Sequence, residues 1–439
     1  MSESDTPPEQ LSNRERQEAW RIDPRQDPAD LPLGRLNPGH EALFEANTAL
    51  PYFDRLRREA PVHLCEDSQY GPYWNVTRYD DIVYVDTHHD LFSSDIRLGG
   101  IRIGGRPLQS EPDPTTHLPM FIMEDPPEHD EHRKVLAPLF GPRNLAGLED
   151  LIRERAGRIL DGLPGDEEFN WVRRVSVELT GQMLASLFDV PQEDRHKLIH
   201  WSDTVERLGD PDYFESVREG FAELWKCWEY FDAVWKERAS RAEPGPDLIS
   251  LLAHGAATRD MAPNAYLGNV LLLIVGGNDT TRNSISASVL AQHRFPEEFA
   301  KLQADPALLP NLVSEVIRWQ SPVAHMCRTA TEDTQLGGHT IRKHDKVVMW
   351  YVSGNRDESV FPDADRVIAD RPNARRHLSF GFGIHRCLGN RLGEMQLRVL
   401  WQEILKRFER IEVTDEPRYL RSSFIRGITE LPVRVVPKA

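Results

Sequence analysis

Apolar residues recur every three to four positions through most of the 439-residue chain, a spacing typical of amphipathic helices. The clearest helical patterns lie at residues 149–163, 175–188, 217–241, 264–293, 308–319 and 388–408. Strand-like runs are few and short, and the best lie at residues 73–77, 346–350 and 431–436. The pattern therefore predicts a mainly α protein with small β-sheets.

One long stretch has neither pattern. Residues 97–119 contain the glycine pairs at 99–100 and 104–105, followed by prolines at 107, 112 and 114. Loops longer than about 12–15 residues inside a compact domain are usually functional or mobile. We therefore expect a functional or mobile loop here.

The ends and the bulk composition define the overall organisation. Residues 1–35 are polar and lack the apolar core of a signal or anchor, so we expect a flexible polar tail followed by one domain over 36–439. No apolar run reaches the length of about 20 residues that spans a bilayer, so no transmembrane segment is expected. The formal charge of -17 disfavours nucleic acid as a partner. Four scattered cysteines give no disulfide framework and indicate a cytoplasmic protein.

A single cysteine in a glycine-punctuated loop is the strongest chemical signal. Cys387 lies in the run FGFGIHRCLG at residues 380–389, directly before a helical pattern. One isolated thiolate cannot form a zinc or iron–sulfur site, which needs several ligands, but it can be the axial ligand of a haem iron. The alternative is a buried structural cysteine.

The pattern at 264–293 predicts a helix about 45 Å long, and its middle has an unusual composition. Residues 276–281 read GGNDTT, which places two glycines and four short polar side chains in an otherwise apolar helix. The hydroxyl of Thr280 can reach the carbonyl of Gly276 one turn earlier. The alternative is a kinked core helix.

Two charged pairs have helical spacing. Glu315 and Arg318 are three residues apart, which by itself indicates only an ion pair on one helix face. His129 and Arg133 are four apart, after an Asp-Pro-Pro run whose Asp125 is a candidate helix cap. Histidines and acids at such spacing are compatible with a metal site or a solvated face.

Together, the cysteine loop, the GGNDTT helix and the run EVIR at residues 315–318 resemble the cytochromes P-450, the haem-thiolate monooxygenases. The resemblance implies that haem b lies between a long distal helix and a proximal cysteine loop. It implies that Cys387 is the iron ligand, in a loop that ends at Gly389, and that Phe380 packs on the proximal face. The residues expected at the two propionates are His129, Arg133, Arg328 and His385.

The same resemblance implies catalytic and structural roles. Thr280 would organise the hydrogen bonds of bound dioxygen, and Asp279 would relay protons from solvent. Glu315 and Arg318 would form a structural pair that locks to the segment at residues 371–375. Five arginines and no acid lie between residues 371 and 393, a candidate docking patch for an acidic electron carrier.

Three further runs narrow the resemblance. LPMFI at 118–122, GGNDTTRN at 276–283 and VMWYVSGNRD at 348–357 are similar to the soluble bacterial terminal hydroxylases of alkanes and fatty acids. The resemblance implies hydroxylation of the terminal methyl of medium-length linear chains with O₂. Electrons would come from NADH through a ferredoxin reductase and a ferredoxin.

Terminal selectivity requires a narrow apolar channel, because a terminal methyl C–H bond is stronger than an internal one and only geometry can favour it. By resemblance, the expected walls are Leu98, Ile103, Met120, Phe121, Leu273, Gly276, Val323, Ala324 and Phe424, with Ile101, Ile122, Met123, Leu272 and Ile425 beside them.

Three other interpretations stay open at this point. One is a hydroxylase of bulkier apolar substrates such as terpenes or sterols. Another is a non-catalytic haem sensor, which would not need Asp279 and Thr280. A third is a peroxide-driven enzyme, whose relatives replace this pair with an arginine.

Overall fold

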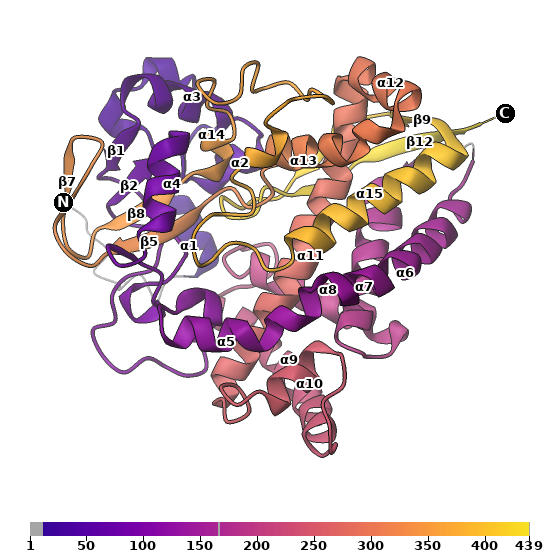
Figure 1. The fold of residues 1–439 in the computed structure, drawn as a ribbon. Helices are drawn as coiled ribbons and strands as arrows, with labels where there is room; N and C mark the ends of the chain where they lie inside the picture. Colours follow the sequence, from indigo (N-terminus) through magenta and orange to yellow (C-terminus); the bar gives the residue numbers. More distant parts are fainter. Residues whose placement is uncertain (1–11, 166, 439) are drawn as a thin grey trace.

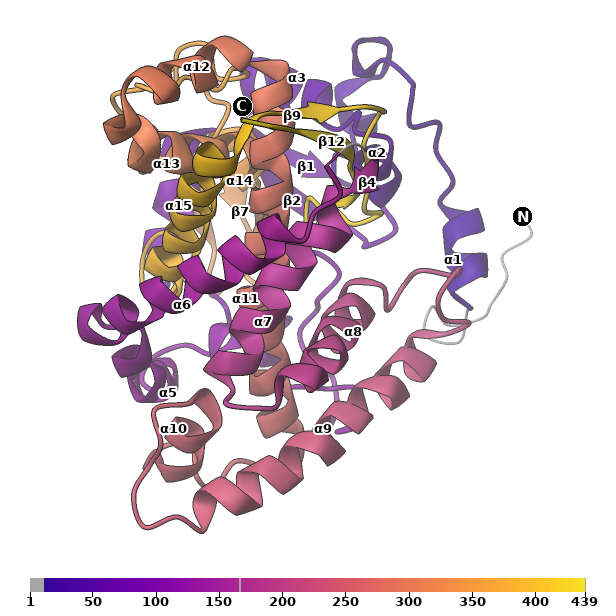
Figure 2. The ribbon, with the colours of Figure 1, turned by 90° about the vertical axis from the view of Figure 1, so that its right-hand side faces the viewer.

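The structure is a computed structural model that describes residues 12–165 and 167–438. Helices form most of it and gather around the long helix α11 (Pro263–Arg294), which runs through the molecule in both views (Figures 1 and 2). The other α-helices are α1 (Asn13–Ala19), α2 (Glu41–Glu45), α3 (Leu50–Glu59), α4 (Tyr79–Thr87), α5 (Glu128–Leu136), α6 (Pro142–Asp161), α7 (Val177–Leu187), α8 (Arg195–Glu206), α9 (Val217–Ala239), α10 (Leu248–His254), α12 (Pro296–Ala304), α13 (Leu309–Gln320), α14 (Tyr351–Gly354) and α15 (Asn390–Arg407).

The strands are β1 (Val62–Cys65), β2 (Tyr73–Val76), β3 (Phe92–Ser93), β4 (Phe169–Asn170), β5 (Met326–Ala330), β6 (Thr334–Leu336), β7 (His339–Ile341), β8 (Lys346–Met349), β9 (Phe408–Val413), β10 (Arg418–Tyr419), β11 (Ile428–Glu430) and β12 (Pro432–Pro437). They lie on both sides of α11, with β1, β2, β5, β7 and β8 at the left of Figure 1 and β9 and β12 at the upper right. The largest sheet has five strands in the order β1-β2-β8-β5-β3, and only its β2–β8 pair is parallel.

Trp350 fixes this sheet to the helices at its edge. Its ring is fully buried and lies 4.8 Å from the ring of Phe53 on α3. Its indole N–H donates to the Asn75 side chain of β2 at 2.7 Å, so the one polar atom of the ring is satisfied. The segment after β8 is thereby held over the sheet.

The helix and strand predictions are confirmed. Each of the six helical patterns corresponds to a helix (α6, α7, α9, α11, α13 and α15), and the three strand patterns correspond to β2, β8 and β12. A π-helical turn, Val172–Ser176, precedes α7 and overlaps the start of the predicted range by two residues. The mainly α fold class with small sheets is therefore correct.

The cap prediction at Asp125 is wrong. Helix α5 begins after Pro127 and has no side-chain cap. The Asp125 carboxylate instead accepts hydrogen bonds from the Ser93 hydroxyl and the Ser94 backbone N–H. The acid binds the end of β3 and the residue after it rather than starting a helix.

The polar side chains in the middle of α11 are satisfied within the helix or by its neighbours. The Thr280 hydroxyl donates to the Gly276 carbonyl at 3.0 Å, as expected, and the Ser284 hydroxyl donates to the Thr280 carbonyl at 2.8 Å. Asn278 accepts from the hydroxyl of Thr180 on α7 at 2.7 Å. Buried polar groups cost little once they are paired, so the helix continues through this segment.

Residues 1–11 of the expected tail lie outside the described residues. In the part of the tail that is described, the side-chain amide of Asn13 on α1 donates to the carbonyls of Leu208 and Phe214. The division at residue 36 stays a prediction. Among the helices that the structure describes, none combines the length and apolar character needed to cross a membrane.

Candidate active site

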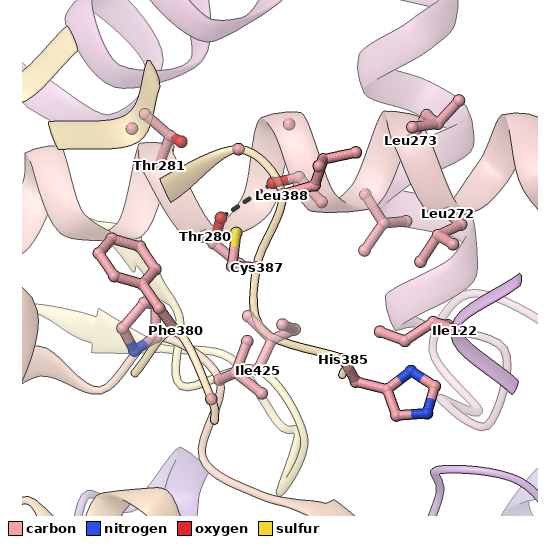
Figure 3. A pocket seen from close by; sticks show the side chains of 18 of the residues that line it. Ile122, Leu272, Leu273, Thr280, Thr281, Phe380, His385, Cys387, Leu388 and Ile425 are labelled. Carbon is pink, nitrogen blue, oxygen red and sulfur yellow. Dashed lines mark hydrogen bonds between the residues drawn. The ribbon is translucent and has the colours of Figure 1, made fainter. Parts of the chain in front are cut away.

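A cavity of about 260 Å³ lies between α11 and the cysteine loop. Figure 3 shows Leu272, Leu273 and Thr280 from the helix and Phe380 and Cys387 from the loop around this space. Most of the lining is aliphatic or aromatic, and its polar groups are few. Pockets of this kind bind an apolar ligand and orient it with a few polar contacts.

The loop geometry explains its glycines. Gly381 and Gly383 have φ angles of 67° and 64°, a region that favours glycine. A Cβ on Gly383 would lie 2.3 Å from the backbone oxygen of Asp86. The loop closes with a 2.8 Å hydrogen bond from the Cys387 N–H to the Phe380 carbonyl, which places the cysteine at the cavity wall.

The Cys387 side chain is exposed to the cavity but lies deep inside the protein. Burial raises the pKa of its thiol, while a backbone hydrogen bond at Gly389 and the charge of Arg133 act in the opposite direction. A metal ion bound at the sulfur would remove the thiol proton outright. The position therefore fits a metal ligand better than a free nucleophile.

Arg133, Arg328 and His385 line this cavity, and His129 packs against His385. Arg133 donates to the Arg386 carbonyl, and Arg328 donates to the Asp86 carboxylate at 2.7 Å. The rings of His129 and His385 lie 4.3 Å apart. The structure thus brings the four expected propionate contacts together.

The two imidazoles have unsatisfied atoms. Nε2 of His129 and both ring nitrogens of His385 are buried and have no hydrogen-bond partner within the described chain. Burial lowers the pKa of His129, and burial with the nearby Arg328 charge lowers that of His385. Neutral imidazoles retain an N–H donor, and buried donors require a partner.

These residues fit a haem. The donor set of two guanidinium groups and two imidazoles suits a pair of carboxylates. The backbone at Gly276 faces open space, because a Cβ there would meet no atom within 4 Å. A flat iron-containing group with two propionates fits this arrangement, since the propionates would accept hydrogen bonds from the orphaned imidazoles and the Cys387 thiolate would hold the iron.

Thr280 and Asp279 do not share the cavity. Thr280 lines it, whereas Asp279 is fully buried behind it. The Asp279 carboxylate accepts from the Ser202 hydroxyl at 2.9 Å and pairs with Arg282 at 2.8 Å. Burial raises the pKa of Asp279, and Arg282 opposes this shift. Both oxygens are occupied on the side of α8.

The Glu315–Arg318 pair is completely buried rather than on the surface. The two side chains meet at 2.8 Å, and the same glutamate pairs with Arg371 at 2.8 Å. Arg318 also donates to the backbone carbonyls of Asn355, Ala364 and Arg366. The pair thus joins α13 to the irregular segment that contains Arg371.

Most of the expected pocket wall lines the cavity. The residues in place are Met120, Phe121, Leu273, Gly276, Val323 and Phe424, with Ile101, Ile122, Met123, Leu272 and Ile425.

The assignment of three wall residues is corrected. Ile103 and Ala324 belong to the core cluster around Trp350 instead. Leu98 lies in a short 3-10 turn whose carbonyl accepts from Thr329, and it does not reach the cavity. This loop has no regular periodicity, so Ile101 faces the cavity while Ile103, two residues later, packs in the core.

Several cavity residues had no sequence signal that assigned them. Leu184 and Leu187 of α7 and Val205 of α8 contribute apolar wall from ordinary amphipathic helices. Arg102 lies between two residues that the sequence did single out. Only the glycine-rich loop around it indicated that its neighbourhood is functional or mobile.

A family model described as Cytochrome P450 matches residues 62–433. The Linalool 8-monooxygenase of Pseudomonas putida is 39% identical over 400 residues, which cover 90% of this chain and 98% of that protein. The Methyl-branched lipid omega-hydroxylase of Mycobacterium bovis is 33% identical over 394 residues, covering 87% and 90%. Among solved structures, CYP153D17 from Sphingomonas sp. PAMC 26605 is 44% identical with a TM-score of 0.85, covering 91% and 99%.

Proposed function

The chain belongs to the cytochrome P450 family and is a monooxygenase, and on this premise we propose that it hydroxylates the terminal methyl of medium-length linear apolar chains. The observation that carries the proposal is the apolar cavity that joins Thr280 to Cys387. The similarity to an omega-hydroxylase of lipids supports the terminal position. Alkanes and fatty acids are the proposed substrates.

Haem is the cofactor of the family and, when bound, supplies the activation of O₂ and the transfer of one oxygen atom to carbon. In this chain Cys387, three residues before α15 begins, would hold the iron, and Phe380 would pack beside it. The residues that would hold the propionates are His129, Arg133, Arg328 and His385. Their unsatisfied imidazole nitrogens support this role.

Thr280 would hold and donate a proton at its hydroxyl oxygen, which faces the cavity. Its bond to the Gly276 carbonyl orients the hydroxyl. Asp279 would supply protons to it, but its oxygens bind Ser202 and Arg282 in this structure. Transfer therefore requires one of these two bonds to exchange before Asp279 can serve Thr280.

The walls would select the terminal carbon. Aliphatic side chains from the loop before α5 and from α11 surround the space beside Thr280, among them Ile122 and Leu273. Narrow walls hold a linear chain end-on and exclude its internal carbons from the reacting position. They would also exclude bulk water from the proton-donating hydroxyl.

We propose that electrons come from NADH through a ferredoxin reductase and a ferredoxin. Arg375, Arg376, Arg386 and Arg391 are exposed around the cysteine loop, while Arg371 is buried with Glu315. An exposed basic surface favours the approach of an acidic carrier.

A second candidate is hydroxylation of branched or terpenoid chains. The similarity to a linalool 8-monooxygenase, at 39% identity over nearly its whole length, favours it specifically. Both candidates place oxygen near the end of an apolar chain, but they differ in the width of the chain that must fit.

The test is a titration of the haem-loaded protein with decane, decanoate and linalool, followed by product analysis with a ferredoxin system. A saturable low-spin to high-spin shift with decane or decanoate and a terminal alcohol product would support the proposal. A shift with linalool alone would transfer the assignment to terpenoids. Absence of any shift would reject both.

A separate prediction tests Cys387 as the ligand of the haem iron. Cys387→Ala should abolish the thiolate-haem absorption signature completely, because no other cysteine lines the cavity in the described chain. Cys227→Ala, at a cysteine buried away from the cavity, is the matched control and should keep the signature. A Cys387→Ala protein with the normal spectrum would reject Cys387 as the ligand.

A further inference from the structure

Arg102 is a cation at the cavity whose donors are not used by the protein. Its guanidinium lies over the ring of Phe424, 4.9 Å from the centroid, and lines the cavity. Its nearest carboxylate oxygen is Oε1 of Glu206, at 3.9 Å, which is too far for a hydrogen bond. The structure gives no hydrogen bond from this guanidinium to any residue that it describes.

The other two cavity arginines differ in this respect. Arg133 donates to a backbone carbonyl of the cysteine loop, and Arg328 donates to the buried Asp86 carboxylate. Both also lie with the two histidines that suit a haem. Arg102 lies instead beside Phe424 and the end of α8, so the haem does not account for it.

Glu206 behind Arg102 is also unsatisfied. Its side chain is 1% exposed, and its Oε1 has no hydrogen-bond partner within the described chain. Its other oxygen is 3.5 Å from the Ser422 hydroxyl. A buried carboxylate with so few donors is poorly stabilised in its charged form.

The electrostatics around Glu206 agree with this geometry. Burial raises its pKa to about 7, and the negative charge of Asp279 acts in the same direction. Arg102, Arg282 and the Ser422 hydroxyl oppose the shift. Near neutral pH a large fraction of Glu206 is therefore protonated, and Arg102 keeps a positive charge that no nearby group neutralises fully.

We propose that Arg102 binds the carboxylate end of a fatty-acid substrate while the chain extends along the apolar cavity. This inference deepens the proposed function and rests on it. The guanidinium presents a planar fork of N–H donors that matches a carboxylate with two hydrogen bonds. An amphiphilic chain supplies one carboxylate for this cation and apolar surface for every wall beside it.

The site would determine both substrate class and position of attack. Anchoring the carboxylate at Arg102 fixes which carbon reaches the space between Thr280 and Cys387. Glu206 would act as a positioning residue, since its protonated form leaves the guanidinium free, whereas its charged form competes with the substrate for it. Chain length would then decide between terminal and subterminal products.

The test compares four ligands of equal chain length: decanoate, methyl decanoate, 1-decanol and decane. Their affinities for the haem-loaded protein are measured by calorimetry and by the spin-state shift. Arg102→Gln should weaken decanoate about ten- to hundredfold, the range for hydrogen bonds between charged groups. The ester and the alkane should bind as to the wild type.

The matched control is Arg97→Gln, in the same loop. Arg97 is mostly exposed, pairs with Asp95 and does not line the cavity, so decanoate affinity should be unchanged. Glu206→Gln removes the competing carboxylate and should tighten decanoate binding several-fold. This second variant tests the proposal even if Arg102→Gln does not fold.

Each other outcome overturns the proposal. Equal losses for all four ligands would show that Arg102 only supports the loop. An equal loss for 1-decanol and decanoate would show recognition of a hydroxyl rather than of charge. If decanoate affinity is the same in the wild type, Arg102→Gln and Glu206→Gln, Arg102 does not bind the carboxylate. The proposed terminal hydroxylation would not be affected by that result. Failure of every ligand to bind the wild type would instead reject the proposed function, and this inference with it.

Discussion

Glu315 and Glu206 are buried to nearly the same extent, but they differ in how many hydrogen-bond donors surround them. The Glu315 side chain is 0% exposed and receives hydrogen bonds from Arg318, Arg371 and the backbone N–H of Ile368. The Glu206 side chain is 1% exposed, and one of its oxygens has no partner within the described chain. Burial alone therefore says little about what a carboxylate does.

The difference separates a structural region from a binding region. The Glu315 carboxylate receives all its hydrogen bonds from groups of the protein, so no unpaired atom is left there for a ligand to bind. Around the cavity, by contrast, buried atoms of Glu206, His129 and His385 have no partner within the described chain. Polar groups that a protein buries without satisfying are candidates for contact with a ligand.

Breaking the satisfied network should have the largest effect on stability. Arg318→Ala removes the guanidinium that bridges Glu315 to three backbone carbonyls and leaves a buried, partly uncompensated carboxylate. Removing one partner of such a pair typically costs about 3–5 kcal/mol. Urea denaturation of the holoprotein should show this loss, together with poor haem retention.

The control is an exposed arginine pair. Arg342 meets Asp333 at 2.8 Å, with side chains 70% and 53% exposed. Surface pairs contribute about 0–1 kcal/mol, so Arg342→Ala should leave the unfolding midpoint almost unchanged. If both substitutions cost the same, the distinction between a closed network and a surface pair would be wrong for this protein.

The sequence predicted these regions to different extents. Local patterns sufficed for α11, the cysteine loop and the Glu315–Arg318 spacing, because each is encoded within a few consecutive residues. The state of Glu206 could not be predicted, since it depends on how the end of α8 packs against residues far away in the sequence, Arg102 and Ser422. Ile103 was assigned to the wrong side because irregular loops lack the periodicity that orients side chains.

The titration of Glu206 should have the next largest effect on the free energy of unfolding. Its pKa rises from an ordinary 4.5 to about 7, so between these values the native state holds a proton that the unfolded chain releases. Wild-type stability therefore falls across this window by about 3 kcal/mol from this group, at about 1.4 kcal/mol per pH unit, and then stays level.

Glu206→Gln lacks this titration. The difference in free energy of unfolding between Glu206→Gln and the wild type should therefore increase by about 3 kcal/mol from pH 4.5 to pH 7.5. The wild type loses stability over this range, whereas the amide stays neutral throughout. Urea denaturation of both proteins at several pH values measures the gap. A gap that stays constant with pH would show that Glu206 is satisfied in solution, as Glu315 is.

Asp279 shares features with both Glu315 and Glu206. Substitution of Thr280 tests whether Asp279 is a structural carboxylate or a functional one. Its carboxylate is satisfied like that of Glu315, by Ser202 and Arg282, yet it borders the cavity through Thr280. If Asp279 delivers protons, the hydroxyl of Thr280 must pass them on. Thr280→Ala should then lower product formed per NADH consumed by roughly tenfold, less than the hundredfold or more typical of a lost proton donor, because water can partly replace the hydroxyl. Thr280→Ser keeps the hydroxyl that reaches the Gly276 carbonyl and should retain most of the coupling.

Neither change should alter the unfolding free energy by more than about 0.5 kcal/mol, as expected for a side chain that faces open space. Full coupling in Thr280→Ala would place Asp279 with Glu315, as a structural carboxylate that merely lies next to the site.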